Sequence, residues 1–417
     1  MPAPSNSCDT ATTVKPLSVE QTLTQLLRHA TAIDGTEVLP TADCLGRVLA
    51  EPVISSADLP CWDNSAMDGY ALRAADLADH GGYLPVRQRI AAGHCGEPLA
   101  AGTAARIFTG APLPEGADTV VVQEVCEPDG DGIRVTADVS PGANIRRRGE
   151  ELRAGTEVLA PGVRLGPQHL GLAAGVGANR LRVCRRLKVA TFSTGDELVM
   201  PGKPLSPGQI YNSNRFLYRA LLQRLGCEVI DLGIVEDDLD ATVAALSGAA
   251  QQADLVLASG GVSVGDEDHI RPAIEQLGNL DLWRVAMRPG KPLAFGHIGD
   301  TPFIGSPGNP VSLFVTFCLF ARPFIQRMQG MADAGQPTPI QAVADFEIRR
   351  PLSRRDYQRA RLEIDADGST KVRVFTSTSS AALTSLTWAN GLAIVPEGQT
   401  VAPGDRVQFL PFSELIP

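Results

Sequence analysis

The middle of the chain, from residue 187 to about residue 330, alternates short apolar runs with longer segments of helical periodicity. Bounded apolar runs predict strands, and apolar residues three and four positions apart predict helices. Strands that alternate with helices of this length are typical of βαβ units, so we expect a doubly wound α/β domain with a parallel sheet. The pattern predicts strands at 187–193, 228–232, 255–259, 282–287, 293–295 and 303–305, and helices at 214–225, 238–250, 268–277 and from Pro310 onward.

A β-rich module is predicted between residues 58 and 143, where short β-branched runs are separated by Pro/Gly turns. The segments on either side of it look like two parts of one further unit, so the module is interpreted as an insertion. The predicted elements are an amphipathic helix at 17–30 capped by Ser18, a short strand at 47–54, β runs at 105–108, 119–125 and 133–139, and a strand, a helix opening near Pro167 and another strand within 150–186.

The C-terminal region is predicted to be a small β-barrel or sandwich, because it alternates apolar and polar residues and contains Asp-Gly and Pro-Gly-Asp turns. A chain of 417 residues is too long for one compact core. We therefore expect a multi-domain protein of the α/β plus β class. The predicted boundaries are 17–57 with 144–186 for domain I, 58–143 for domain II, 187–330 for domain III and 338–417 for domain IV.

The charge balance argues against a nucleic-acid partner. The formal net charge is −10, from 37 basic and 47 acidic residues. Nucleic-acid binding proteins usually carry a basic excess or stripe, whereas here one dense basic cluster, Arg146 to Arg148, is followed at once by Glu150 and Glu151. An acidic chain with a few concentrated Arg and Lys residues is better suited to a small anionic substrate.

Eight cysteines are dispersed along the chain, without a CxxC pair or a Cys/His cluster of zinc-ligand spacing. This pattern is typical of reduced cysteines in a cytosolic protein. The first 16 residues lack the basic start and apolar core of a signal peptide. The longest apolar run, residues 311–321, is too short to span a bilayer. We therefore expect a soluble, cytoplasmic protein with no membrane partner.

Polar, glycine-containing loops follow three of the predicted strands. They comprise residues 193–197, 259–268 and 305–310. In open α/β sheets, ligands bind outside the carboxyl ends of the strands, so these loops are expected to meet at one binding edge. The glycines of 260–265 would let the backbone approach an anion, and Ser263 adds a hydroxyl donor. This loop is neither a Walker A nor a GxGxxG motif, and taken alone it is also compatible with a plain tight turn.

Acidic residues gather near the same strand ends. Carboxylates around a phosphate loop would repel one another and the substrate, and Mg²⁺ resolves this conflict because it takes oxygen ligands from protein and phosphate. The alternative is that each acid caps a helix, and for Asp238 and Asp268 the spacing favours both interpretations equally. The acids are Asp196, Glu197, Asp237, Asp238, Asp266 and Asp268.

Three cations follow, at Arg284, Arg288 and Lys291. Prolines on both sides of Gly290-Lys291 stiffen the segment and would hold these charges in place. Cations held in this way suit an oxyanion such as phosphate or molybdate. A solvated surface turn is the alternative, and the density of Pro and Gly makes it the less favoured one.

Seven short blocks together resemble the MoeA-type molybdopterin molybdotransferases, which are related to the E domain of gephyrin. The resemblance runs from about residue 17 to the C-terminus, and seven blocks in the same order are much more specific than any one of them. The blocks are DNSAMDGYA at 63–71, TGAP at 109–112, NIRRRGE at 144–150, STGDEL at 193–198, GGVSVG at 260–265, PGKP at 289–292 and PGNP at 307–310.

The resemblance implies a homodimer of elongated, four-domain subunits, with domain II inserted in domain I. It implies an active site shared across the dimer, where domain III of one subunit faces domain II of the other. The family reaction is Mg²⁺-dependent and converts adenylyl-molybdopterin and molybdate to molybdenum cofactor and AMP. An upstream adenylyltransferase, which makes the adenylylated substrate, is a further partner that the resemblance suggests.

Carried over by position, the resemblance implies five acids in catalysis, namely Asp68, Glu151, Glu197, Asp237 and Asp268, of which Asp237 and Asp268 hold the metal. Glu151 stands where relatives often carry Asp, and Arg284 and Arg288 stand where some carry Lys, which changes the local ligand geometry. The implied substrate-binding residues are Thr109, Ser193, Thr194, Gly260, Gly261, Ser263, Arg284, Arg288, Lys291, Pro307, Gly308 and Asn309, with Arg359 and Ser380 of domain IV completing a molybdate pocket.

Two other functions stay open at this point. The α/β domain also resembles the adenylyltransferases that make the activated pterin, and such an enzyme would consume ATP with molybdopterin. A gephyrin-like scaffold without catalysis is the second alternative, although the chain has no long linker or fused partner domain. Because function lives in sites rather than in folds, molybdate-dependent AMP release is the measurement that separates these alternatives.

Overall fold

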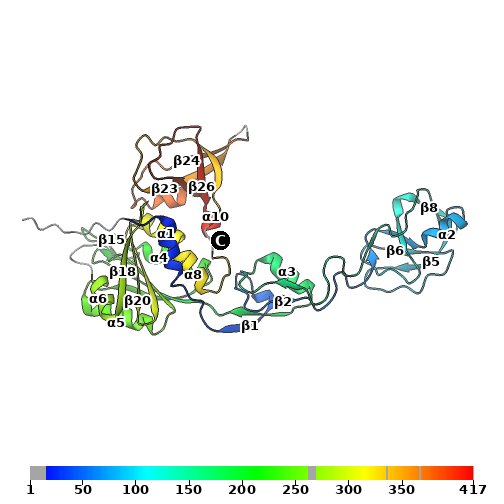
Figure 1. Ribbon diagram of the computed structural model, residues 1–417, viewed down its shortest axis with the longest axis horizontal. Coiled ribbons are helices and arrows are strands. Elements are labelled where there is room, and N and C mark those ends of the chain that lie inside the picture. The colour runs from blue at the N-terminus through cyan, green and yellow to red at the C-terminus, as the bar shows by residue number, and fades with distance from the viewer. Residues whose placement is uncertain (1–15, 262–268, 335–336, 366–367, 417) are drawn as a thin grey trace, which may run out of the picture.

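The computed structural model describes residues 16–261, 269–334, 337–365 and 368–416 of the 417-residue chain. The molecule is elongated (Figure 1). Domains III and IV lie together at one end, domain I extends from them, and domain II lies at the far end of the long axis. Each of these four parts has a hydrophobic core of its own.

Domain III contains a six-stranded sheet of order β16-β13-β17-β21-β20-β18. Its pairings are parallel except at β20, which is antiparallel to both neighbours. The all-parallel sheet predicted from the sequence is wrong for this strand, because the short connections on both sides of it permit only antiparallel pairing. The strands are β13 (Lys188–Thr194), β16 (Glu228–Val235), β17 (Leu255–Ser259), β18 (Gly278–Arg284), β20 (Pro292–Ile298) and β21 (Thr301–Ser306).

Helices cover both faces of this sheet. Successive residues of β17 point to opposite sides, so Leu255 and Leu257 enter one core while Val256 and Ala258 enter the other. A strand buried on both faces reads as a continuous apolar run, which is why the sequence predicted it well. The covering helices are α4 (Asn214–Arg224), α5 (Leu239–Ala250), α6 (Ile270–Leu277) and α7 (Pro310–Thr316), which continues through a π-helical segment (Phe317–Ala321) into α8 (Arg322–Met328).

The continuous helix from Pro310 to Met328 is long and apolar enough to cross a membrane by length and composition, but almost all of it is buried in the core. The predicted buried helix is thus confirmed. Its apolar residues pack in the protein core. The π-helical segment ends at Ala321, two residues before Pro323. A proline has no N–H and its ring clashes with the carbonyl four residues back, and a π-bulge relieves that clash inside a helix.

The N-terminal helix α1 (Val19–Leu27) begins at Ser18, as predicted. The Ser18 hydroxyl accepts from the Gln21 amide, and the Gln21 side chain accepts from the Ser18 amide, which forms a capping box. The apolar face of α1 packs against domain III, with Val19 and Leu26 buried in its core. The predicted boundary at residue 17 therefore assigns to domain I a helix whose apolar stripe is buried against domain III.

Domain I is assembled from two separated segments of chain. Strands from before the insertion pair with strands from after it, and their apolar side chains share one core. Of the strand predicted at 47–54, the structure has β2 and isolated bridges at Val48 and Leu49. The elements are β1 (Thr36–Pro40), a 3-10 turn (Thr41–Asp43), β2 (Val53–Ile54), β11 (Glu157–Leu159), α3 (Pro167–Gly175) and β12 (Arg180–Cys184).

Domain II is the inserted β-rich module, and its sheet has the order β7-β4-β6-β5-β9-β8. The predicted β runs coincide with β6, β7 and β9, whereas β4, β5 and helix α2 were not predicted. The elements are β3 (Asn64–Ser65), β4 (Gly69–Leu72), α2 (Ala74–Asp79), β5 (Tyr83–Ile90), β6 (Ala104–Ile107), β7 (Thr119–Val122), a 3-10 turn (Gln123–Val125), β8 (Cys126–Asp129), β9 (Gly132–Val135) and β10 (Ile145–Arg146), which pairs with β3.

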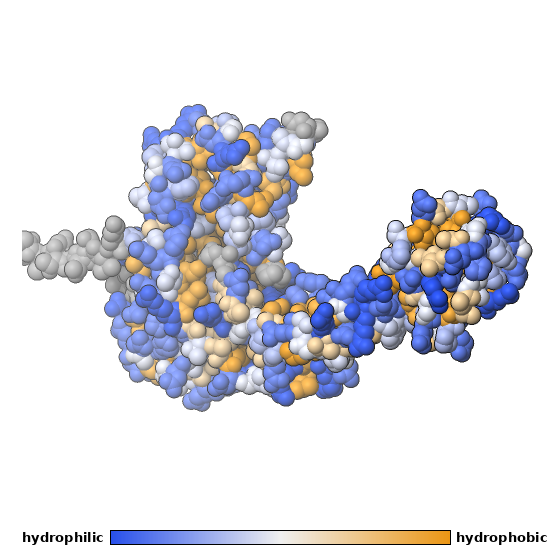
Figure 2. Space-filling model, turned by 45° about the vertical axis from the view of Figure 1, so that its right-hand side comes forward, coloured by the Kyte–Doolittle hydropathy of each residue, from blue (hydrophilic) through white to orange (hydrophobic). Residues whose placement is uncertain are grey.

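Two chain segments connect domains I and II side by side, and ion pairs hold them together. The Arg147 guanidinium lies 2.6 Å from the Asp63 carboxylate, and that of Arg148 lies 2.6 Å from Asp58. Figure 2 shows mostly hydrophilic residues on this narrow connection. Arg147 and Arg148 of the basic cluster therefore stabilise the connection through these ion pairs.

Domain IV is a closed barrel, as predicted. Its strands follow the order β23-β24-β22-β26-β25, and β25 pairs back onto β23. The short strand β19 of domain III pairs with β23 and so joins the two domains. The elements are β19 (Met287–Arg288), β22 (Ile340–Ala344), β23 (Arg355–Ile364), β24 (Thr370–Val374), α9 (Thr384–Trp388), β25 (Gly391–Val395), β26 (Arg406–Pro411) and α10 (Phe412–Leu415), and the remaining pair in domain III is β14 (Leu198–Val199) with β15 (Ile210–Tyr211).

Candidate functional site

The carboxyl ends of β13, β17 and β21 lie side by side and form the floor of the candidate site. Ser193 is in register with Ser259, and Ser259 with Ser306. The Ser193 and Ser259 hydroxyl oxygens are 2.9 Å apart, and all three serines are buried. Thr194 directly follows Ser193 and is also buried. The structure thus brings the three polar loops together at one edge of the sheet.

The first two glycines of the 260–265 loop occupy backbone positions that only glycine suits. Gly260 and Gly261 have φ of +89° and +63°. A Cβ on Gly261 would lie 2.6 Å from the Ile270 side chain, and one on Gly260 would lie 3.0 Å from the Thr194 carbonyl oxygen. The start of this loop therefore packs closely against its own domain, and a side chain at either position would disturb that packing. Ser263 and Asp268 lie outside the described residues.

The third loop, Pro307 to Asn309, packs against the glycine loop and is held from two sides. A Cβ on Gly308 would lie 3.7 Å from the Gly260 Cα. The Asn214 side-chain amide donates to the Gly308 carbonyl at 2.7 Å, and the Val311 amide donates to the Ser380 carbonyl at 3.1 Å. Ser380 of domain IV therefore borders the predicted anion site through its backbone.

The acids near these strand ends differ in their surroundings: Asp237 and Glu197 follow strands, whereas Asp238 caps a helix. Asp237 is half-buried after β16, and Glu197 is exposed after the neighbouring strand β13. Asp238 instead caps α5, since its carboxylate accepts from the Ala241 amide at 2.9 Å. Across the described residues, no three His, Cys, Asp or Glu side chains form a group that could hold a metal ion. The described carboxylates on this edge, which exclude those of 262–268, therefore do not form a metal cage by themselves.

The cations lie at the same edge of the sheet. Arg284 ends β18, and Lys291 immediately precedes β20 and accepts through its carbonyl from the Val285 amide at 2.9 Å. Both side chains are exposed. The Arg288 guanidinium lies 4.0 Å from the Asp356 carboxylate of domain IV. Burial raises the pKa of Asp356 above its usual range, even though Arg288 opposes this effect.

Arg359 is buried in domain IV, with 2% of its surface exposed. Its guanidinium donates to the carbonyls of Ser377 and Ser379, at 2.7 and 3.2 Å, and to the Ser385 hydroxyl at 3.1 Å. These bonds fix the loop that carries Ser380. We therefore infer that Arg359 shapes this wall of the site, whereas the sequence suggested a direct molybdate contact.

Replacing Arg359 by Met should destabilise domain IV by about 2–4 kcal/mol, because the buried Ser385 hydroxyl and two partly buried carbonyls lose a charged donor at once. Chemical denaturation followed by tryptophan fluorescence would measure the change. Arg361→Met is the matched control, since Arg361 lies on the same strand but is partly exposed. An Arg359 variant that is no less stable than the control would contradict this role.

Asp68 and Thr109 lie together on domain II. One Asp68 carboxylate oxygen accepts from the Thr109 amide at 2.8 Å and from its hydroxyl at 2.9 Å. These two hydrogen bonds, with the charge of Arg106 nearby, lower the pKa of the exposed Asp68. Within one chain, domain II lies away from the edge of the domain III sheet (Figure 1). Glu151 is exposed on the connection between domains I and II, apart from the Asp68–Thr109 pair and from the domain III edge.

Some contacts of the site could not be found from the sequence. Ser259 and Ser306 belong to the predicted loops and Asn214 opens a predicted helix, but their contacts depend on strand register. Nothing in the sequence pointed to Asp356. The alternation of apolar and polar residues along a strand does not reveal which carboxylate is buried against another domain.

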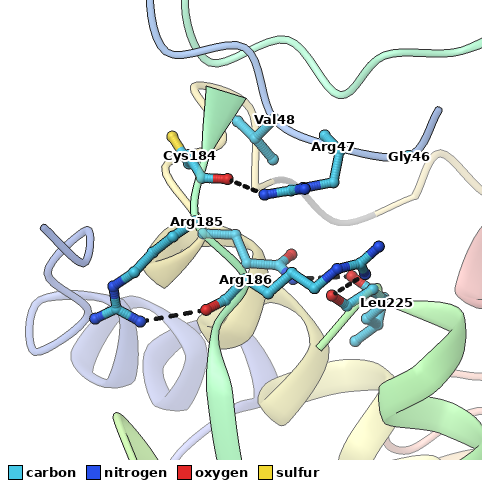
Figure 3. Close-up of a pocket in the computed structure, with 9 residues that line it drawn as sticks. Gly46, Arg47, Val48, Cys184, Arg185, Arg186 and Leu225 are labelled. Atoms are coloured by element: carbon cyan, nitrogen blue, oxygen red, sulfur yellow. Dashed lines mark hydrogen bonds between the residues drawn. The ribbon is translucent and has the colours of Figure 1, made fainter. Parts of the chain in front are cut away.

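A cluster of arginines at the junction of domains I and III is structural. Arg47 donates to the Cys184 carbonyl at 2.8 Å, and Arg186 donates to the Gly226 carbonyl at 2.9 Å (Figure 3). The cavity that they line has a volume of about 10 Å³, which is room for one water at most. This junction therefore offers no space for a substrate.

Comparisons with known proteins cover all four domains. Residues 17–177 match the MoeA N-terminal region (domain I and II), residues 190–327 match a probable molybdopterin binding domain, and residues 341–412 match the MoeA C-terminal region (domain IV). A molybdopterin molybdenumtransferase of Haemophilus influenzae is 37% identical over 402 residues, which cover 96% of this chain and 100% of the relative. The chain belongs to the MoeA family.

Other MoeA-family members agree with this assignment. A molybdopterin molybdenumtransferase of Nostoc is 38% identical, with 90% of this chain and 88% of the relative covered. The crystal structure of the molybdopterin biosynthesis protein moeA from Pyrococcus horikoshii is 29% identical and superposes with a TM-score of 0.81, covering 95% of this chain and 99% of that one. The family fold thus extends over the length of the chain.

Proposed function

We propose that this MoeA-family chain inserts molybdate into adenylyl-molybdopterin and releases AMP, which yields the molybdenum cofactor. The observation that carries the proposal is the match over all four domains to relatives named molybdopterin molybdenumtransferase. The polar edge of domain III supports it, because that edge combines a glycine loop with exposed cations.

In this proposal, the edge of domain III binds the anionic parts of both substrates. The amides around Gly260 and Gly261 would receive phosphate oxygens, and Ser263 would add a donor. Lys291 and Arg288 would hold the molybdate oxyanion. The Arg288–Asp356 contact keeps this arginine at the border between domains III and IV, where Ser380 also lies.

We further propose that the active form is a homodimer. Asp68 and Thr109 lie on a domain that, within one chain, is distant from the domain III edge (Figure 1). A second chain would bring its own Asp68–Thr109 pair to that edge and complete the site.

The Mg²⁺ requirement also remains a proposal. Mg²⁺ at phosphate sites is commonly held by one or two carboxylates together with substrate oxygens, so a cage of three protein ligands is not needed. The half-buried Asp237 fits such a role, and Asp268 is its proposed partner. When bound, the ion would neutralise phosphate charge. The lowered pKa of Asp68 keeps this carboxylate ionised at neutral pH, which favours a role in positioning water over that of a proton donor.

The match of the chain to domains I, II and IV, in addition to the α/β domain, favours molybdate insertion over the adenylyltransferase step. An upstream adenylyltransferase is then the proposed source of the substrate, and the cytoplasm is the proposed location. A scaffold without catalysis would have no need for the glycine loop and its cations.

The proposal is tested by incubating purified protein with adenylyl-molybdopterin, Mg²⁺ and molybdate and measuring AMP by chromatography. We expect AMP release that depends on molybdate. ATP consumption with unmodified molybdopterin would instead support the adenylyltransferase step, and the absence of both activities would support a scaffold.

A further inference from the structure

A buried carboxylate accompanies one of the cations that the proposed function assigns to molybdate. Asp356 on β23 has 3% of its surface exposed. It is in parallel register with Arg288 on β19, so the pairing of the two strands holds both residues at the border of domains III and IV. The side chain of Arg288 is 33% exposed, which leaves it accessible to an anion. The pair therefore joins a buried negative charge to an accessible positive charge.

The ion pair between these two residues is loose. The Arg288 guanidinium lies 4.0 Å from the Asp356 carboxylate, which is the outer limit of an ion pair and beyond hydrogen-bond distance. Within the described parts of the chain, the one hydrogen bond to this carboxylate comes from the Gln358 side-chain amide, at 2.5 Å. Arg288 is therefore attracted to Asp356 by charge, but no hydrogen bond between them has to break before the guanidinium can turn to a ligand.

Other charges near Asp356 act on it more weakly than Arg288 does. Arg354 and Arg359, on the same strand, affect Asp356 only through the field of their charges. Arg359 donates its hydrogen bonds to serines of the neighbouring loop. Helix α9 and strand β25, which also pack against β23, contain no titratable residue within their bounds. Arg288 is therefore the cation with the largest effect on this carboxylate.

The protonation of Asp356 depends on whether the charge of Arg288 is engaged elsewhere. Burial already raises the pKa of Asp356, and the positive charge of Arg288 opposes this rise. An oxyanion bound to Arg288 would neutralise that charge and would add negative charge nearby. Both effects raise the pKa of Asp356 further, so the carboxylate would take up a proton when the anion binds. Binding that takes up a proton becomes tighter as the pH falls.

We propose that Asp356 is a positioning residue that couples molybdate binding to the uptake of a proton. Without the anion, its carboxylate is the counter-charge of Arg288. With the anion bound, Arg288 turns to the oxyanion and Asp356 becomes a neutral carboxylic acid. The inference rests on the proposed function, because it takes Arg288 and Lys291 as the oxyanion site.

The proton has a consequence for specificity. Molybdate carries two negative charges, which the charges of Arg288 and Lys291 balance only when Asp356 is neutral. With Asp356 ionised, one net positive charge would remain, and this charge suits a monoanion instead. Uptake of the proton therefore matches the charge of the site to a tetrahedral dianion.

Isothermal calorimetry of the full-length protein with molybdate tests the inference. Titrations between about pH 5 and pH 7, in pairs of buffers with different ionisation enthalpies, give the number of protons taken up per anion bound. The parent chain should take up more protons than Asp356→Asn, which has the same shape but no titrating carboxyl. At neutral pH this variant should bind molybdate about ten-fold more tightly, the effect of one pKa unit, and the difference should vanish as the pH falls.

Two further variants serve as controls. Asp356→Glu keeps a titrating carboxyl and should restore the proton uptake. Asp345→Asn is the matched control, because Asp345 belongs to the same barrel and pairs with Arg373 at 2.7 Å, but is exposed. It should take up as many protons as the parent chain does. Thermal unfolding of each variant would verify that the fold is unchanged.

The inference is overturned if Asp356→Asn takes up as many protons as the parent chain, or if the parent chain does not bind molybdate. It is also overturned if the variant binds molybdate more weakly by the same factor at every pH, since Asp356 would then only support the local structure. The titration requires no turnover, so failure of the proposed function would appear separately, as a parent chain that binds molybdate but releases no AMP in the molybdate assay.

Discussion

Asp68→Asn should lower molybdate-dependent AMP release by about a hundred-fold or more, which is the usual contribution of a positioned catalytic carboxylate. The amide has the same shape and can still accept from the Thr109 amide and hydroxyl, so the local structure should survive while the charge is lost. AMP release under saturating substrate, with circular dichroism as a check of the fold, measures the effect.

Asp129→Asn is the control for this substitution, because Asp129 is an aspartate of the same domain that pairs with Arg134. The pH profile gives a second check. The folded-state pKa of Asp68 lies below the ordinary value of about 4, so the carboxylate stays charged from neutral pH down to that region. Loss of activity that titrates near neutrality must then arise from another group. Equal activities of Asp68→Asn and Asp129→Asn would remove Asp68 from the proposed site.

Mixing two inactive variants should restore activity if the site is shared between subunits. In the proposed site, Asp68→Asn should disable the domain II contribution, and Asp237→Asn should disable the contribution of the domain III edge. In a mixed dimer, one of the two sites receives an intact domain II from one chain and an intact domain III from the other. Random exchange of equal amounts makes half of the dimers mixed, so about one quarter of the parent activity is expected.

The measurement is AMP release after the two variants are co-expressed or allowed to exchange subunits. The controls are each variant alone and a mixture kept at a low temperature at which the subunits do not exchange. A mixture that stays as inactive as its components, while sedimentation shows mixed dimers, would contradict the shared site and place both acids in one chain.

The α/β domain was predictable because its strands are buried on both faces. Residues 255–259 were predicted as a strand, and β17 has these bounds, since a doubly buried strand is a continuous apolar run between turns. The direction of β20 was not predictable from its composition, because direction depends on the length of the flanking connections. The sequence also showed the apolar stripe of α1, but a stripe does not identify the core that receives it.

Domain II was predicted less completely. Strand β5 contains Pro85 and polar residues at half-exposed positions, so it has no clear apolar alternation. Strand β4 overlaps the end of the sequence block at 63–71, and its four residues are too few to show a period.

The candidate site was partly predictable. Topology places loops after parallel strands at one edge, which located Ser193, Gly260 and Gly308 correctly relative to one another. The burial of Arg359 could not be predicted, because a long charged side chain is usually exposed, and only the loop folded around it explains its position.

The pair of chain segments that leads into domain II also has a mechanical consequence. A single-stranded tether would let a module rotate about its own axis, whereas two antiparallel segments clamped by Arg147–Asp63 and Arg148–Asp58 resist torsion and still allow bending. Domain II should therefore swing in an arc without rotating about its own long axis. In the proposed homodimer, this would keep the same side of domain II turned toward the second chain.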